Sequence, residues 1–255
     1  MKAQWEYRAV LAVDIEKSSG RGNVALVRNR ETLRALLREA FVRSGLDWDA
    51  CVREDLGDGL RVTAPAGTRK ASLVHPLVHE LAALLRDHND RTREQSTRIR
   101  VRTALHAGEV CLMPAGPVVG APLEALARLL DAPPARKALA GAPQTVPVSL
   151  LMSQHFYDET VRHGYDGVDP AAFHRVSFTL KEFTADAWLH TPGWTPPREP
   201  KAPAGKAATR KRDRAQGGSK QVSRASGNGV VYATQNGDMH IRVDKGPRKG
   251  SWDGS

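Results

Sequence analysis

Two short segments of the sequence each carry an aspartate at the end of an apolar, strand-like run. They are residues 12–16 and 54–59, and their aspartates are Asp14 and Asp58. An aspartate at a strand end often caps the following turn, which is the ordinary structural explanation. Two carboxylates on rigid strand ends can also hold two magnesium ions against a nucleoside triphosphate. Both interpretations stay open at the level of these two segments alone.

The spacing of apolar residues predicts an α+β fold. We expect a strand at 7–14, a helix at 24–43, a hairpin at 50–63, a helix at 71–88, and strands at 98–106 and 109–113. Further helices are expected at 122–130 and 148–163, and further strands at 175–180 and 187–190. This order is typical of a ferredoxin-like βαββαβ core with an antiparallel-rich sheet and helices on one face, extended by a C-terminal helix and strands.

The basic character of the chain lies in its C-terminal part. Residues 1–197 hold 25 Lys and Arg against 23 Asp and Glu, whereas residues 198–255 hold 13 against 5. The folded part is therefore nearly neutral, and we expect no specific nucleic-acid binding. For the basic tail, a weak contact with nucleic acid or an anionic membrane remains an alternative to a plain soluble spacer.

The amino-acid composition of the sequence changes after Trp194. We expect residues 1–194 to form one domain, 195–226 to be a disordered linker rich in Pro, Ala, Lys and Arg, and 227–255 to carry a β-hairpin around an Asn-Gly turn. The absence of a long apolar run and of a secretory signal predicts no transmembrane segment and a cytoplasmic location. The cysteines, Cys51 and Cys111, are expected to be buried, reduced thiols.

The ordered motifs resemble the catalytic domain of class III nucleotidyl (adenylate and guanylate) cyclases over roughly residues 5–190. The matching segments are the strand ending in Asp14-Ile15, the Gly57-Asp58 hairpin, an arginine-rich strand leading into the His-Ala-Gly-Glu-Val sequence at 106–110, and a Val-Val-Gly turn followed by a helix that ends in Arg128 and Leu129. The resemblance implies the fold described above. It also implies a divergent enzyme that makes a 3′,5′-cyclic nucleoside monophosphate and pyrophosphate from a nucleoside triphosphate.

That resemblance further implies a two-metal site. Asp14, Asp58 and the backbone carbonyl of Ile15 would bind two Mg²⁺ (or Mn²⁺) ions. Backbone amides around Lys17, Ser18 and Ser19 would bind the phosphates at the start of the first helix.

Four residues elsewhere in the sequence complete the implied site. Arg128 would stabilise charge that develops on the α-phosphate, and Lys181 would bind the triphosphate.

Glu124 stands where the family has an asparagine, and an ionised carboxylate donates no hydrogen bond. A catalytically impaired pseudo-cyclase that signals through its tail is therefore the alternative function. Glu54 occupies the base-selecting position, where a carboxylate favours guanine, and an ordinary ion pair with a neighbouring arginine is its alternative.

The family's active sites usually form between two protomers. The resemblance thus implies a homodimer in which Asp14 and Asp58 of one protomer work with Arg128 of the other. His106 is expected to be a hydrogen-bonded structural residue, and Arg100 and Arg102 are expected on a solvated strand face or a dimer surface.

The C-terminal segment carries a second resemblance. Residues 227–241 are similar to short amyloid-type signalling motifs of bacterial effectors, with an unstructured tail as the alternative. A functional motif would bind a partner protein through residues 227–243 by strand stacking.

Overall fold

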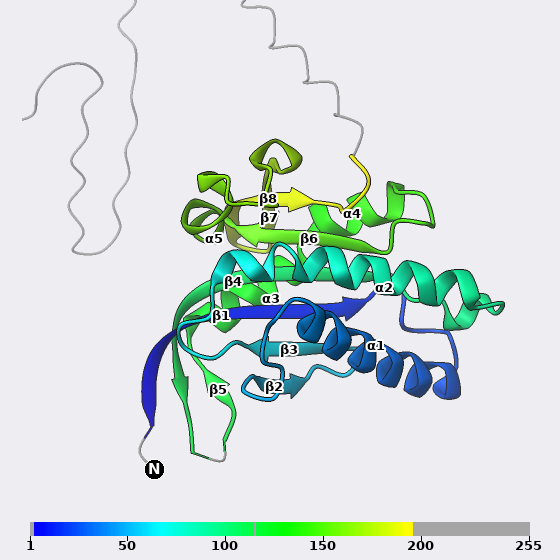
Figure 1. Ribbon diagram of the computed structural model, residues 1–255, viewed down its shortest axis with the longest axis horizontal. Helices are drawn as coiled ribbons and strands as arrows, with labels where there is room; N and C mark the ends of the chain where they lie inside the picture. Colours follow the sequence, from blue (N-terminus) through cyan, green and yellow to red (C-terminus); the bar gives the residue numbers. More distant parts are fainter. Residues whose placement is uncertain (1–2, 115, 196–255) are drawn as a thin grey trace, which may run out of the picture. The chain divides into compact units, whose positions relative to one another are not determined.

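The computed structural model describes residues 3–114 and 116–195, which form one eight-stranded sheet flanked by helices (Figure 1). The strand order is β2-β3-β1-β4-β6-β8-β7, and β5 pairs with β4. The α+β prediction is confirmed. The expected linker from residue 196 onward and the C-terminal hairpin lie outside the described residues. No helix in the described ranges is both long and apolar enough to cross a membrane.

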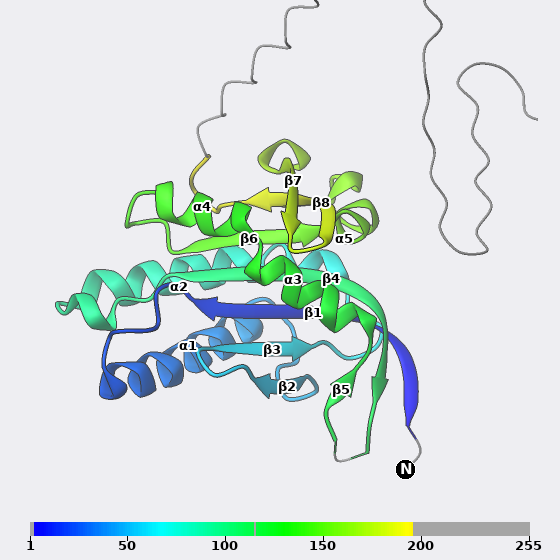
Figure 2. The ribbon, with the colours of Figure 1, turned by 180° about the vertical axis from the view of Figure 1, so that it is seen from behind.

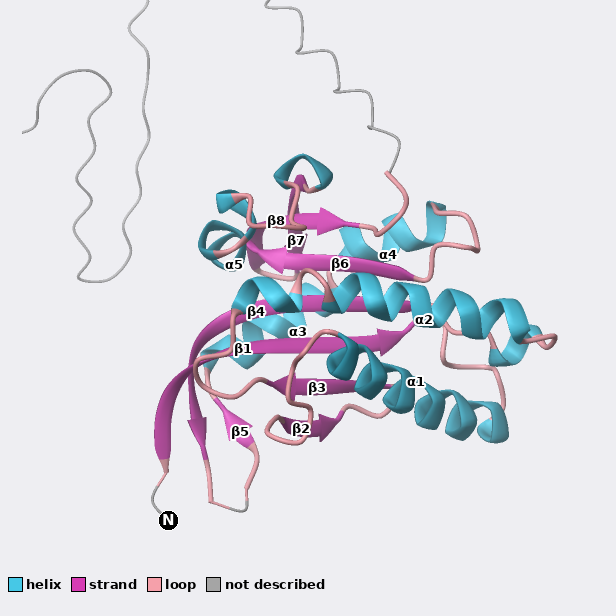
Figure 3. Cartoon of the chain, in the orientation of Figure 1, coloured by secondary structure: helices cyan, strands magenta, loops and turns pink. Residues whose placement is uncertain are grey.

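The centre of the sheet consists of two long antiparallel strands (Figure 3). These are β1 (Gln4–Ile15) and β4 (Val101–Leu112), which pair along their whole length. The other strands are β2 (Val52–Asp55), β3 (Gly59–Thr63), β5 (Val118–Val119), β6 (Val148–Ser153), β7 (His174–Leu180) and β8 (Phe183–His190). All neighbouring strands are antiparallel except β4 and β6, which run parallel.

Helices cover both faces of the sheet, so the prediction of helices on one face was wrong (Figures 1 and 2). The first face carries α1 (Asn23–Arg43) and α2 (Leu77–Arg91), and the second carries α3 (Ala121–Asp131) and α4 (Pro133–Gly141). The reason lies in β1, where successive residues are apolar and both sides are buried. Leu11 and Val13 face the first core, whereas Val10 and Ala12 face the second.

Two sequence-based boundaries were also wrong. The segment 98–113 contains one continuous strand, because Gly108 does not break β4 but makes room for α3. A Cβ at Gly108 would lie 2.6 Å from Cγ of Pro122. The segment 148–163 is not one helix. It begins as the buried strand β6 and continues as α5 (Gln154–Glu159), which Ser153 caps by accepting a hydrogen bond from the Phe156 amide at 3.0 Å.

Short 3₁₀ turns and the cysteines complete the description. The turns are η1 (Lys70–Leu73), η2 (Gln95–Thr97), η3 (Val161–His163) and η4 (Pro170–Ala172). Cys51 and Cys111 are both buried and free, as expected.

Candidate functional site

The two aspartates singled out in the sequence lie together at one end of β1. Asp14 pairs with Gly59 across the β1–β3 ladder, and the backbone N–H of Ile15 donates to the carbonyl oxygen of Asp58 at 3.3 Å. A Cβ at Gly59 would lie 2.1 Å from the Val13 carbonyl oxygen, so this close approach requires glycine. The hairpin turn therefore brings the Asp58 carboxylate to the end of β1, beside that of Asp14.

The electrostatics of this pair follow from its burial. Asp14 is only 7% exposed. Burial raises the pKa of Asp14 to about 6; the Arg102 guanidinium opposes this rise, whereas the charge of Asp58 and a hydrogen bond to it contribute to the rise. The hydroxyl of Ser18 donates a short hydrogen bond to Oδ2 of Asp58. A buried carboxylate and a partly exposed one thus lie side by side.

Arg102 belongs to this site, and its predicted place on a solvated face or a dimer surface was wrong. It lies directly opposite Asp14 in the β1–β4 register and forms an ion pair with it, with side chains 12% and 10% exposed. Its Nε and Nη1 atoms are buried without a hydrogen-bond partner among the described residues. Arg102 is the site residue that sequence reasoning missed. Antiparallel pairing of β1 with β4 in this register is the signal that would have found it.

Arg100, for which the same surface location was expected, is also buried. Its guanidinium lies 3.5 Å from the Glu16 carboxylate, and its Nε donates to the Val146 carbonyl oxygen at 3.1 Å. The expectation failed because α3 covers the face of β4 that carries Arg102, whereas Arg100, one residue before β4, donates to the carbonyl oxygen of Leu139 in α4.

A cleft of about 300 Å³ opens between the carboxylate pair and α3. Its lining residues come from β1, the β2–β3 hairpin, β4 and α3: Ala12, Asp14, Leu56, Asp58, Arg61, Arg102, Leu123, Leu126, Ala127, Leu130 and Asp131. Within residues 3–114 and 116–195, no three His, Cys, Asp or Glu side chains form a complete metal cage. Magnesium is often bound by only one or two protein carboxylates, with substrate phosphates and water as its other ligands. The hard oxygen donors of Asp14 and Asp58 fit that requirement.

Arg128 and Lys181 line a different hollow, of about 850 Å³. The Arg128 guanidinium lies 4.7 Å from the centre of the Phe183 ring and 3.5 Å from the Glu124 carboxylate. The Arg128 side chain is 45% exposed. Ala127 and Asp131 of α3 line both spaces. The structure therefore brings the predicted site residues together in two adjacent groups rather than in one.

The remaining predicted site residues lie near the carboxylate pair. Lys17 and Ser19 are exposed in the turn that follows β1, beside Ser18. Glu54 accepts hydrogen bonds from Arg61 at 2.8 and 3.0 Å, which is the ion pair with a neighbouring arginine that the sequence left open. Its role in base selection stays a prediction.

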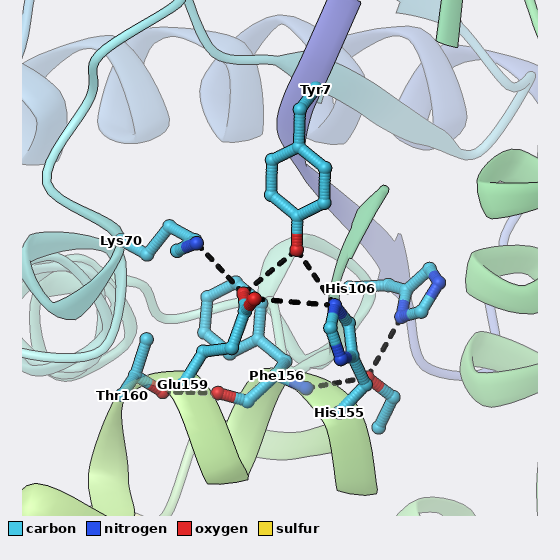
Figure 4. A network of polar contacts seen from close by, with 8 residues as sticks. Tyr7, Lys70, His106, His155, Phe156, Glu159 and Thr160 are labelled. Carbon is cyan, nitrogen blue, oxygen red and sulfur yellow. Dashed lines mark hydrogen bonds and ion pairs between the residues drawn. The ribbon is translucent and has the colours of Figure 1, made fainter. Parts of the chain in front are cut away.

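His106 has the structural surroundings that were expected for it. Its Nδ1 lies 2.8 Å from the Ser153 hydroxyl, next to a network centred on Glu159 (Figure 4). The Glu159 carboxylate accepts hydrogen bonds from Tyr7 at 2.8 Å and Lys70 at 2.7 Å. Burial lowers the pKa of His106, and the nearby His155 ring adds to this effect. Tyr7 stands near the opposite end of β1 from Asp14, so this network is separate from the carboxylate site.

No family model and no curated protein matches the sequence. Solved structures do match it. The guanylyl cyclase Cya2 is similar at 15% identity and a TM-score of 0.52, over 75% of this chain and 93% of that chain. An adenylate/guanylate cyclase/hydrolase from Silicibacter pomeroyi is similar at 17% identity and a TM-score of 0.53, over 75% of this chain and 99% of that chain. The chain therefore has the fold of class III adenylate/guanylate cyclase domains, and the expected resemblance is confirmed.

Proposed function

We propose that this protein is a divergent class III nucleotidyl cyclase, which converts a nucleoside triphosphate into a 3′,5′-cyclic nucleoside monophosphate and pyrophosphate. One observation carries the proposal: two carboxylates, Asp14 and Asp58, lie side by side in one cleft of a cyclase fold. Burial and mutual repulsion make such a pair unfavourable by itself. A divalent cation would relieve both effects, so the arrangement is suited to metal-bound phosphate.

Asp14, Asp58 and the Ile15 carbonyl would hold two Mg²⁺ or Mn²⁺ ions. When bound, these ions would lower the pKa of the ribose 3′-hydroxyl and neutralise the leaving pyrophosphate. The Ser18 hydroxyl would keep the Asp58 carboxylate oriented through its hydrogen bond. Backbone amides from Lys17 to Ser19 would meet the phosphates.

Arg102 would act as a further phosphate ligand. In the absence of substrate, its guanidinium compensates the charge of Asp14. Its Nε and Nη1 groups, which lack partners among the described residues, are N–H donors that suit phosphate oxygens. We expect Arg102 to shift part of its interaction from Asp14 to the triphosphate when substrate binds.

The second half of the active site would come from another copy of the chain. Arg128 and Lys181 lie in a hollow separate from the Asp14 cleft, and Arg128 is well exposed. In a two-fold dimer, these cations could reach the triphosphate held by the partner's carboxylates. Arg128 would then stabilise negative charge on the α-phosphate in the transition state.

Guanine is the base that we favour, because the Glu54 carboxylate can accept hydrogen bonds from guanine N1–H and N2–H₂. The ion pair with Arg61 would have to open to free Glu54 for this contact. Arg61 itself lines the cleft of Asp14 and Asp58.

One observation favours the second candidate function, a pseudo-cyclase. Glu124 lies 3.5 Å from Arg128, so a carboxylate competes with substrate for the very arginine that turnover requires. Such a protein would bind nucleotide without converting it and would act through its C-terminal tail.

The test is incubation of the full chain with ATP, GTP, CTP or UTP and Mn²⁺, with cyclic monophosphate detected by mass spectrometry. A product that Asp14→Ala abolishes and the exposed-site control Asp166→Ala retains would establish the cyclase and identify its base. Nucleotide binding without product, from folded protein, would support the pseudo-cyclase. The absence of both nucleotide binding and cyclic product would contradict both candidates.

A further inference from the structure

A small basic pocket lies beyond the ends of β1 and α2, apart from the cleft of Asp14. Its volume is about 110 Å³, and its lining residues are Glu16, Lys17, Arg21, Asn89, Gln95, Arg98, Arg100 and Gln144. None of these residues lines the carboxylate cleft. Four of the lining side chains are cationic and one is a carboxylate, so positive charge exceeds negative charge within a confined space.

The frame of this pocket is fixed by hydrogen bonds. Arg21 donates to the carbonyl oxygens of Lys17 at 2.7 Å, Arg98 at 2.6 Å and Glu16 at 2.6 Å. Arg100, which is 7% exposed, donates to a backbone carbonyl and lies beside Glu16. Burial lowers the pKa of both Arg21 and Arg100, although each stays a cation. The charges are thus held in place before any ligand arrives.

Arg98 differs from the other two arginines. Its carbonyl oxygen is held by Arg21, but its side-chain Nε is buried and has no hydrogen-bond partner among residues 3–114 and 116–195. A buried N–H group without an acceptor is unfavourable, and this applies more strongly to a charged group. The one carboxylate of the pocket, Glu16, is already paired with Arg100. The Arg98 side chain therefore has a buried donor for which the described residues supply no acceptor.

We propose that this pocket binds a small inorganic oxyanion of the phosphate type, with Arg98 as its principal ligand. The amide groups of Gln95 and Gln144, both exposed at the pocket, add neutral donors. The volume of about 110 Å³ is well below the roughly 300 Å³ at which pockets begin to hold drug-sized molecules, so a nucleotide does not fit. This inference does not depend on the proposed cyclase activity.

An anion in the pocket would act on the carboxylate site through the backbone segment that follows β1. Glu16 and Lys17 follow directly after Asp14 and Ile15, and Arg21 ties this connection to the segment before β4. An anion bound to Arg98 would fix the same connection more firmly. A ligand that binds only the folded state also raises the unfolding temperature, and the rise grows with the logarithm of the ligand concentration once this exceeds Kd.

The experiment measures binding of inorganic phosphate to the full chain by calorimetry, at constant ionic strength and without nucleotide or divalent metal. Arg98→Gln is compared with Arg93→Gln, which removes the same charge from an exposed residue nearby. All proteins keep the basic tail, so its contribution is equal. We expect Arg93→Gln to bind like the wild type and Arg98→Gln to bind at least tenfold more weakly. Equal binding by Arg98→Gln and wild type, or no saturable binding by wild type, would overturn the proposal.

A second variant covers the case in which Arg98→Gln does not fold. Gln144→Glu leaves the buried groups in place and adds a negative charge at the pocket, so it should also weaken phosphate binding at least tenfold; unchanged binding would overturn the proposal. Competition with a non-hydrolysable nucleoside triphosphate tests whether the site is separate. Independent binding supports the proposal, whereas mutual displacement would assign the pocket to the triphosphate site and overturn it.

Discussion

Replacement of Asp14 by asparagine should make the metal-free protein progressively more stable than the wild type as the pH rises through neutrality, although Asp14 is a site residue. Burial raises the pKa of Asp14 from 3.8 to about 6. The folded state therefore retains a proton at pH values where the unfolded chain has released it. Because the unfolded state binds fewer protons, the free energy of unfolding falls as the pH rises from the unfolded to the folded pKa. A difference of roughly 2 pKa units corresponds to ~3 kcal/mol over the whole range.

The assay is urea unfolding of EDTA-treated full-length protein at pH 5, 6, 7 and 8. The advantage of Asp14→Asn over wild type should grow by ~1.4 kcal/mol between pH 5 and pH 8, the part of the linkage effect that falls in this window. The altered contact with Arg102 changes the unfolding free energy of Asp14→Asn by the same amount at every pH, so it is not part of this increase. The control Asp166→Asn alters an exposed aspartate and should show a constant offset. A constant offset for Asp14→Asn as well would refute the reasoning.

Three further variants test other parts of the account. Glu124→Asn should raise cyclic-nucleotide production severalfold, because it frees Arg128 from a competing carboxylate; a fall in turnover would give Glu124 a role of its own. Glu54→Lys should break the ion pair with Arg61 and shift kcat/KM from GTP toward ATP, and an unchanged base preference would remove Glu54 from the pocket. Burial and two neighbouring histidines lower the pKa of His79 from 6.5 to about 4, so stability present above pH 6.5 is lost as the pH falls toward 4. His79→Gln should make this loss of unfolding free energy smaller in urea titrations. An identical dependence of the unfolding free energy on pH in the variant and the wild type would show that His79 is not its source.

The parts of the site that were predictable from the sequence depend on local signals. Asp14 ends an apolar strand and Asp58 lies in a glycine turn, and these features, together with the order of the motifs, sufficed to indicate the fold and to pair the two residues. Arg102 could not be found in the same way, because its contact with Asp14 depends on the register between strands far apart in the sequence. An arginine next to apolar residues in a strand looks solvated until the helix that covers it is known.

The errors in the fold have a similar origin. The apolar run at 148–152 has no period that separates a buried strand from a helix, and its burial between β4 and β8 decides the matter. The helix α4 begins with Pro133 and Pro134 and was not predicted, although proline is well tolerated in a first helical turn. The unbroken apolar run of β1 does indicate burial on both sides, but which helices form the second layer depends on the packing of α3 and α4.

Complementation between two inactive variants tests the proposed shared active site most directly. Asp58→Asn removes a carboxylate and Arg128→Ala removes the arginine that we assign to the other protomer, so each homodimer should make no cyclic nucleotide. In an equal mixture that has exchanged subunits, half of the dimers would be mixed and would hold one intact site, which restores about a quarter of wild-type activity. Recovery near that level is the predicted result. A mixture that exchanges subunits but stays inactive, or an Arg128→Ala protein that is fully active alone, would contradict the account.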